Sequence, residues 1–506
     1  MVLARSWSVA LLGIDGRVVE VEADIGAGMP GMKLVGLPDP GLKEAKDRVR
    51  AAVRNSGQKW PEQHVTLGLS PANLPKLGSG YDLSIAAAVL AASGAVSGSK
   101  LLGTVLIGEL ALDGRIRPVP GVLPALLAAR KDGVRRAVVP VDSLFEAALV
   151  HDMEVLGAAR LRDLLAWMDD VENLATPEPA IEEKPPPVAD LADVIGQPDA
   201  RWALEVAAAG GHHLLLTGPP GVGKTMLARR LPGLLPALCS EESLEVTAVH
   251  SIEGKLSSSS PLIRIPPFAD PHHTISVAAL VGGGTDIAKP GMISRAHRGV
   301  LFLDEVCEFR SECLESLRTV LEDGEIRIAR RKGVVCYPAR FQLVLATNPC
   351  PCAPPREADC TCSPFARRRY FGKLSGPLLD RIDLRVRMRP LTAMHTHAHE
   401  FDDPEPTAQV RARVLRARER AAKRWAEHGW RTNAEVPGPM LRREYALPRE
   451  TTTLLDRGLD QGVVTARGVD RCLRVAWTLS DLTEADRPDS DHVAAAFEFR
   501  DRQAAA

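Results

Sequence analysis

The chain has 506 residues, of which 45% are hydrophobic, and its 63 basic and 64 acidic residues leave a net charge of -1. This length predicts two or three domains, and the balanced charge means that any nucleic-acid contact must come from local basic patches. No apolar run reaches the ~18 residues of a membrane span, and no signal-peptide cleavage pattern follows the N-terminus, so we expect a cytoplasmic protein.

Residues 1–170 are predicted to form an α/β domain that opens with two strands around the turn "IDGR". Two later stretches, "LPKLGSGYDLSIAAAVLAASG" (74–94) and "GELALDGRIRPVPGVLPALLAARKDGVRRAVVP" (108–140), resemble the S5-like fold of Lon protease domains.

In that resemblance the nucleophilic serine falls at Gly80 and the lysine at Leu123. Ser79 and Ser84 lie nearby, but neither restores a serine–lysine pair at these positions. The domain is therefore expected to be a non-proteolytic scaffold or binding platform.

Residues 171–188 are predicted to be a linker, because they are rich in proline and glutamate and show no apolar period. Residues 189–395 contain the predicted nucleotide-binding and cysteine motifs, which are described below. Residues 396–506 are predicted to form a helical lid domain. His395, His397 and His399 alternate in the loop between these two parts, where a solvated hinge explains them better than a metal site.

"HHLLLTGPPGVGKTMLARRL" (212–231) predicts a strand, a phosphate-binding loop and a helix. Backbone N–H groups of such a loop face phosphate oxygens, Lys224 would contact the β- and γ-phosphates, and the Thr225 hydroxyl would bind Mg²⁺. The predicted nucleotide-binding residues are Gly218, Pro219, Pro220, Gly221, Val222, Gly223, Lys224 and Thr225.

"HRGVLFLDE" (297–305) predicts a buried parallel strand with two acids at its carboxyl end, where α/β sheets place ligands. Asp304 suits Mg²⁺ through water, and Glu305 suits polarisation of the attacking water. The alternative is that the two acids cap a helix.

Two further apolar runs carry a polar residue that could act at the nucleotide. "FQLVLATN" (341–348) ends in Asn348, whose amide could contact the γ-phosphate or the attacking water. "LSGPLLDRIDLRVRM" (374–388) carries Arg381, which is either a structural ion-pair partner or an arginine finger for a neighbouring subunit. The residues themselves leave both roles open.

A hairpin is predicted between the acidic strand and Asn348, with "RRKG" (330–333) as its turn. Arg330, Arg331 and Lys332 at the tip suit the phosphates of a polynucleotide. The alternative is a solvated, charged turn.

Four cysteines, Cys350, Cys352, Cys360 and Cys362, follow a C-x-C, seven residues, C-x-C pattern. In a cytosolic protein this spacing favours a metal, and we predict a structural Zn²⁺ held by four thiolates. Free or redox-active thiols and a [4Fe–4S] cluster are the alternatives.

The order of strand, P-loop, acidic strand, polar strand and arginine segment resembles that of AAA+ ATPases. "ADPHHT" (269–274), "NPCPC" (348–352) and "SGPLLDRID" (375–383) resemble the magnesium-chelatase-like YifB/ComM family, and the likeness runs from about residue 3 to about residue 500.

This resemblance implies a ring-forming, hexameric enzyme that uses ATP and Mg²⁺, with Arg381 acting in trans and paired cysteines as in the family. "TARGVDRCLRVAWTLSDL" (465–482) is similar to the family's sensor-2 region, with Arg467 as the candidate and Arg474 as the alternative. A surface ion pair is the ordinary role for either arginine.

The function expected from these motifs is an ATP-hydrolysing ring motor that acts on branched or single-stranded DNA. By family resemblance this is ComM-like branch migration or helicase activity in recombination or DNA uptake. A magnesium-chelatase-type ATPase subunit that drives metal insertion, and a protein-remodelling ATPase, are the alternatives.

Overall fold

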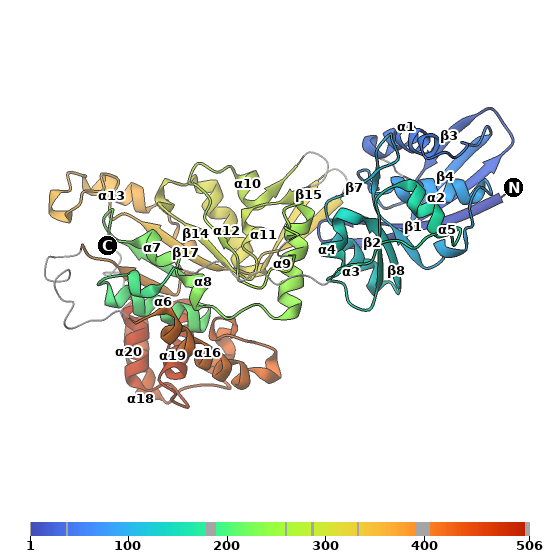
Figure 1. The fold of residues 1–506 in the computed structure, drawn as a ribbon. Helices are drawn as coiled ribbons and strands as arrows, with labels where there is room; N and C mark the ends of the chain where they lie inside the picture. The colour runs from blue at the N-terminus through green and yellow to red at the C-terminus, as the bar shows by residue number, and fades with distance from the viewer. Residues whose placement is uncertain are drawn as a thin grey trace.

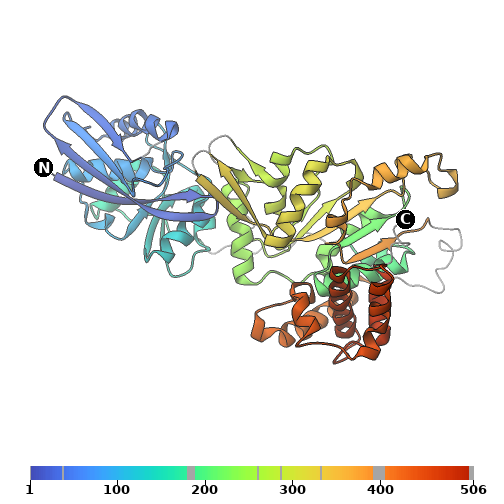
Figure 2. The same cartoon turned by 180° about the vertical axis from the view of Figure 1, so that it is seen from behind.

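The computed structural model describes residues 2–36, 39–178, 189–258, 261–284, 288–330, 333–390 and 405–500. Figures 1 and 2 show an elongated molecule with three parts. An N-terminal domain (residues up to 178) forms one end, a central domain (189–390) follows, and a C-terminal domain of helices (405–500) lies along one side of the central domain.

The N-terminal domain is built on a seven-stranded sheet with the order β3-β4-β2-β1-β5-β8-β9. β1 and β2 form a long antiparallel hairpin, and alternate residues of β2 are buried, as expected for a strand with one face on a core. The strands are β1 (Val2–Leu12), β2 (Asp15–Gly26), β3 (Gly31–Val35), β4 (His64–Ser70), β5 (Thr104–Leu106), β8 (Arg136–Pro140) and β9 (Glu154–Ala158). A separate two-stranded ribbon joins β6 (Glu109–Leu110) and β7 (Ile116–Arg117).

Helix α2 lies at the centre of this domain and is buried along ten of its eleven residues, because "DLSIAAAVLAA" is apolar on every face. The helices of the domain are α1 (Pro40–Asn55), α2 (Asp82–Ala92), α3 (Val122–Lys131), α4 (Leu144–Ala147) and α5 (Leu161–Met168).

The first part of the predicted linker belongs to the N-terminal domain. Ala175 and Gly157 exchange two backbone hydrogen bonds, and Leu174 is buried in the core of the domain. Residues 179–188 lie outside the described residues.

The central domain contains a five-stranded parallel sheet with the order β11-β14-β17-β10-β18. The strands are β10 (Leu214–Thr217), β11 (Phe268–Ala269), β14 (Val300–Leu303), β17 (Gln342–Thr347) and β18 (Leu384–Arg387). β10, β14 and β17 are buried along almost their whole length on both faces, which explains their continuous apolar sequences.

Each face of this sheet has its own core. Leu214 and Leu216 of β10 face α6 and the C-terminal helices, whereas Leu215 faces α12 and its neighbours. The helices of the central domain are α6 (Pro198–Gly210), α7 (Lys224–Ala228), α8 (Leu231–Leu234), α9 (Ser240–Ile252), α10 (Val277–Val281), α11 (Met292–Arg295), α12 (Ser311–Asp323), α13 (Pro364–Phe371) and α14 (Gly376–Leu379).

The predicted hairpin is present as β15 (Glu325–Arg330) and β16 (Gly333–Pro338), with Arg330 opposite Gly333. A smaller ribbon, β12 (Gly282–Gly283) and β13 (Lys289–Pro290), lies near it, and Arg330 Nε donates to the Gly284 carbonyl at 3.0 Å. Arg331 and Lys332, which were predicted to lie at the tip, are outside the described residues.

The C-terminal domain is helical, as predicted, and packs around Trp425, which is fully buried against Trp477 and Tyr445. The Trp425 indole N–H donates to Asn433 Oδ1 at 2.9 Å, so its polar atom is satisfied. The helices are α16 (Thr407–Arg424), α17 (Gly438–Arg442), α18 (Arg449–Asp460), α19 (Ala466–Leu482) and α20 (Ser490–Glu498). His395, His397 and His399 lie outside the described residues.

The N-terminal and central domains meet through α3 and α4 on one side and α9 on the other. The Ser251 hydroxyl donates to Glu146 Oε2 at 2.6 Å, and the Ser251 carbonyl accepts from the Gly121 N–H at 3.0 Å. The β1–β2 turn also reaches β16, because a Cβ added to Gly13 would lie 2.8 Å from the Cys336 carbonyl. None of the described helices combines the length and apolarity needed to cross a bilayer.

Candidate nucleotide-binding site and cysteine cluster

The glycine-rich loop lies at the carboxyl end of β10, between β17 and β18 in the sheet, and leads into α7. Gly221 and Gly223 have φ of +78° and +92°, which other residues adopt only with strain. A Cβ on Gly218 would lie 2.6 Å from the Met388 carbonyl. Each of the three predicted glycines therefore has a local structural reason, and together they let the backbone wrap as a phosphate-binding loop requires.

Lys224 is buried and makes three hydrogen bonds. Its Nζ donates to the carbonyls of Gly218 and Pro219 at 2.6 and 2.8 Å and to Asn348 Oδ1 at 3.1 Å. Burial lowers the pKa of Lys224, and the carboxylates of Asp304 and Glu305 oppose that shift. The structure thus brings the loop lysine and Asn348 together, although 124 positions separate them in the chain.

Thr225 and Asp304 meet at the other side of the loop. The Thr225 hydroxyl donates to Asp304 Oδ2, and Asp304 Oδ1 accepts from the Glu305 N–H at 2.9 Å. A hydroxyl and a carboxylate placed side by side are the oxygen ligands that Mg²⁺ prefers. The residues present therefore fit the predicted magnesium site.

Glu305 follows β14 in the left-handed region, at φ +49°, and its side chain is half exposed. His273 Nδ1 lies 3.5 Å from Glu305 Oε2, and the ring of His272 lies 4.1 Å from that of His273. The ion pair between Arg229 and Asp270, at 3.0 Å, holds the segment that carries both histidines close to the end of α7.

Sequence reasoning missed this contact of His273. It used "ADPHHT" as a family marker without giving the histidines a role. The signal was the pair of adjacent histidines within that motif.

Arg381 does not contact the residues of this loop within the described chain. Its guanidinium pairs with Glu322 at the end of α12 and donates to the Pro377 carbonyl at 2.6 Å. Its own chain therefore holds Arg381 in an ion pair, with the guanidinium largely buried directly after α14.

The two arginines of α19 differ in their surroundings. Arg474 is largely buried, burial lowers its pKa, and its Nε donates to the Val436 carbonyl at 2.7 Å. Arg467 is exposed at the start of α19 and has no side-chain partner among the described residues. A structural role is visible for Arg474, while Arg467 remains the candidate for nucleotide contact.

The four predicted cysteines converge in the segment after Asn348. Their sulfurs all lie within 4.8 Å of one another, with Cys350–Cys352 and Cys350–Cys360 at 3.4 Å and Cys352–Cys360 at 3.5 Å. A disulfide would need about 2.05 Å, whereas four thiolates at about 2.3 Å from one Zn²⁺ lie roughly 3.8 Å apart. The arrangement fits a four-thiolate metal site and excludes a formed disulfide.

Arg367 on α13 supports the same site. Hydrogen bonds from the Cys362 backbone, from the neighbouring thiols and from Arg367 lower the pKa of Cys360 to about 6. A nearby guanidinium favours the thiolate form that binds metal.

In the N-terminal domain, the position expected for a serine is Gly80, and Leu123 is fully buried. Ser79 donates to the Glu109 carboxylate, and Ser84 donates to the Tyr81 carbonyl at 2.8 Å. Each of these serines is therefore hydrogen-bonded to a group other than a lysine.

A parallel sheet with a G-x-x-x-x-G-K-T loop after one of its internal strands, and a carboxylate against the loop threonine, is typical of P-loop nucleotide-binding proteins. Comparison with protein families identifies the group of P-loop proteins to which the chain is similar. "Magnesium chelatase, subunit ChlI" matches residues 190–396, "Subunit ChlI of Mg-chelatase" matches residues 21–143, and the corresponding C-terminal family matches residues 404–500.

Similar proteins match nearly the whole chain. An uncharacterised protein of Mycobacterium tuberculosis is 59% identical, covering 99% of each chain. The uncharacterised protein YifB of Escherichia coli is 41% identical, covering 97% of this chain and 96% of its own. Competence protein ComM of Haemophilus influenzae is 40% identical, covering 99% and 98%. The chain belongs to the YifB/ComM family of magnesium-chelatase-like AAA+ ATPases.

Proposed function

We propose that the protein is a ring-forming ATPase motor that acts on DNA, with branch migration or unwinding of branched or single-stranded DNA as its activity. The proposed ATPase activity rests on two hydrogen bonds at the P-loop. One joins Lys224 to Asn348, and the other joins Thr225 to Asp304. The DNA part is supported by the full-length similarity to a protein named for competence and by the basic hairpin tip.

In this proposal each residue of the site has one task. Backbone N–H groups of residues 218–223 and Lys224 hold the ATP phosphates, and Thr225 and Asp304 would hold Mg²⁺, which neutralises phosphate charge when bound. Glu305 accepts the proton of the attacking water, and Asn348 positions that water or the γ-phosphate.

Arg381 is proposed to complete the site of a neighbouring subunit. Its guanidinium is largely buried and pairs with the exposed Glu322, so a second copy of the chain would have to reach the arginine where Glu322 meets solvent. An arginine supplied in this way stabilises the charge of the transition state. A hexamer is the assembly expected for such a site, and Arg467 would add a contact from the lid.

The cysteine cluster is proposed to hold a structural Zn²⁺. The segment from Cys350 to Cys362 contains few apolar residues, so a metal supplies the cross-link that a core would otherwise give. The N-terminal domain is proposed to be a non-proteolytic platform, and the protein is proposed to work in the cytoplasm.

The test is the ATPase rate of the full chain with and without branched, single-stranded and duplex DNA. Stimulation by branched or single-stranded DNA is expected. If no DNA stimulates turnover and none binds at low salt, the DNA proposal is wrong. Stimulation by a porphyrin-metallating partner would then assign a chelatase-type role, and stimulation by an unfolded protein would assign a remodelling role.

A further inference from the structure

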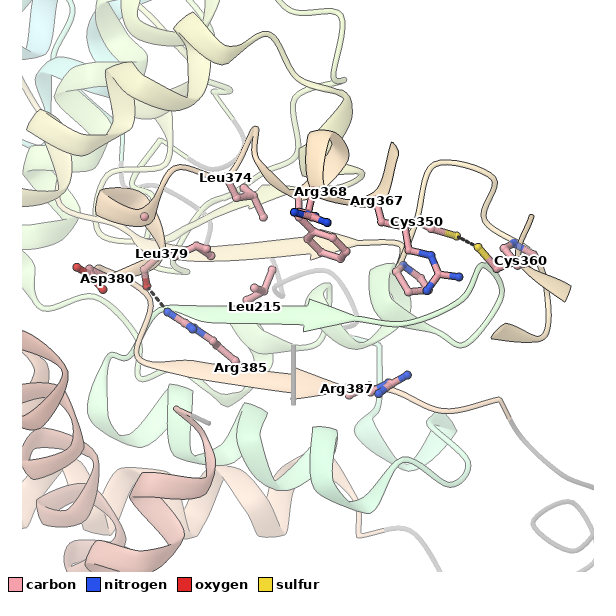
Figure 3. Close-up of a pocket in the computed structure, with 14 residues that line it drawn as sticks. Leu215, Cys350, Cys360, Arg367, Arg368, Leu374, Leu379, Asp380, Arg385 and Arg387 are labelled. Atoms are coloured by element: carbon pink, nitrogen blue, oxygen red, sulfur yellow. Dashed lines mark hydrogen bonds between the residues drawn. The ribbon is translucent and has the colours of Figure 1, made fainter. Parts of the chain in front are cut away.

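A cavity of about 530 Å³ lies between the cysteine segment, α13 and the strands β10 and β18 (Figure 3). Its volume is within the range of small-molecule sites, which is about 300–1,000 Å³. The lining includes none of residues 218–225, and Asp304, Glu305 and Asn348 are also absent from it. The cavity is therefore separate from the nucleotide site of the motor.

The floor of the cavity is apolar. Leu215 and Leu374 are only 2% and 3% exposed, and Phe371 and Leu379 lie beside them. Leu215 faces the cavity because side chains alternate along β10, so that Leu214 and Leu216 belong to the core on the opposite face. A ligand that covers this floor needs an apolar surface of its own.

The rim of the cavity is cationic. Asp380 is the one acidic residue among those that line it, and its carboxylate lies 4.0 Å from Arg500. The Arg385 guanidinium donates to the Leu379 carbonyl at 3.0 Å (Figure 3). The four arginines that line the cavity are Arg367, Arg368, Arg385 and Arg387.

Arg368 is the rim residue most available to a ligand. Its side chain makes no hydrogen bond or ion pair with any other described residue, and it is exposed. Guanidinium groups bind phosphate through paired N–H donors and also stack on planar rings. The rim therefore favours an anion that carries a flat ring.

We propose that this cavity is a second nucleotide-type site, with a base on the Leu215–Phe371 floor and a phosphate at Arg368. An inorganic anion would leave the floor exposed to water, and a neutral apolar molecule would cover the Arg368 guanidinium without neutralising its charge. The same chemistry is offered by a free nucleotide and by one unit of a DNA strand.

The position of the cavity links it to the motor site. Pro349 and Cys350 line it, and they directly follow Asn348, which accepts a hydrogen bond from Lys224 at 3.1 Å. A ligand in the cavity therefore contacts the segment that positions Asn348. This inference goes beyond the proposed function and does not depend on DNA stimulation of the ATPase.

The test uses the full chain carrying Lys224→Ala, which removes binding at the P-loop. Binding of fluorophore-labelled deoxyadenosine monophosphate and of a fluorescein-labelled thymidine tetranucleotide is measured by anisotropy. We expect saturable binding of at least one probe, weakened about tenfold or more by Arg368→Glu, because this change replaces a charge-assisted hydrogen bond to phosphate with repulsion. Arg369→Glu is the matched control: it makes the same charge change one residue away, at a side chain that does not line the cavity.

Binding of the mononucleotide alone assigns the site to a free nucleotide, and binding of the tetranucleotide alone assigns it to a DNA strand. The proposal is overturned if neither probe binds, or if Arg368→Glu and Arg369→Glu bind equally tightly while thermal melting shows both folded. Either negative result leaves DNA-stimulated ATPase activity of the wild type untouched, so the two proposals fail separately.

Discussion

Glu146 of the N-terminal domain accepts a 2.6 Å hydrogen bond from the hydroxyl of Ser251 in the central domain. The carboxyl group is buried where α4 meets α9, and it also accepts from the Leu123 N–H at 3.4 Å. Burial raises the pKa of Glu146 from 4.5 to about 7, and the two hydrogen bonds only partly oppose that shift. The interface between the domains therefore contains a carboxyl group, that of Glu146, which keeps its proton up to a pH of about 7.

This interface should make the stability of the protein depend on pH. Between pH 4.5 and about 7 the unfolded chain loses the Glu146 proton while the folded chain keeps it, so the free energy of unfolding should fall as pH rises through this window. Glu146→Gln should remove that part of the dependence, because the amide keeps hydrogen-bonding capacity without a charge. Urea unfolding of both proteins at several pH values gives the free energy of unfolding as a function of pH. If this free energy changes equally with pH in the two proteins, Glu146 does not titrate in this way.

Hydrolysis should depend on Glu305 more than nucleotide binding does. Glu305→Gln should lower turnover by ~10²-fold or more while ATP still binds, since only activation of water is removed. Lys224→Ala should abolish binding itself, because the substitution removes the ammonium group that would contact the phosphates. Calorimetric binding and steady-state turnover separate the two effects. A Glu305→Gln variant that hydrolyses ATP at the wild-type rate contradicts the role of this residue.

Arg381 should act on the neighbouring subunit. Arg381→Ala rings should bind ATP but hydrolyse it slowly, and mixing them with Glu305→Gln subunits should restore activity at interfaces with an intact finger and an intact base. Glu322→Gln is the control, because it breaks the ion pair of Arg381 and keeps the arginine. If Glu322→Gln is as inactive as Arg381→Ala, and mixed rings form without recovering activity, the arginine serves only its own chain.

The cysteine cluster should carry close to one zinc per chain by elemental analysis. Replacing Cys350 and Cys352 by Ser should release the metal and lower Tm, because metal-binding energy contributes to folding energy. Cys336→Ser is the control, since it removes a half-buried thiol outside the cluster. Metal-free protein with the same Tm as the wild type would refute the structural role.

The hairpin tip should grip DNA through phosphates. Replacing Arg331 and Lys332 by Ala should reduce the slope of log affinity against log salt by about 1 for each phosphate that is no longer neutralised, and should remove DNA-stimulated turnover. Basal ATPase activity should remain. Arg327→Ala is the control, because this strand arginine pairs with Glu325 on the same hairpin. Unwinding of branched DNA at the wild-type rate by the double variant would exclude the tip as the gripping element.

The nucleotide loop and the cysteine cluster were predictable from the sequence because both are local. The glycines of residues 218–223 set their own backbone angles, and two C-x-C pairs seven residues apart cannot lie far from one another. The buried strands were equally readable, because their apolar runs reflect burial on both faces of a parallel sheet. For these features the order of residues along the chain already contains most of the geometry.

Contacts between distant segments were decided by the tertiary structure. The sequence placed Asn348 near the phosphates, but only the pairing of β10 with β17 puts its amide 3.1 Å from Lys224. Likewise, α12 brings Glu322 to Arg381, and the meeting of α4 with α9 buries Glu146. Such contacts depend on how whole helices and strands pack against one another, and packing is a property of many residues at once. Local spacing therefore determined the chemistry that the chain carries, and the packing of its elements decided which of those groups meet.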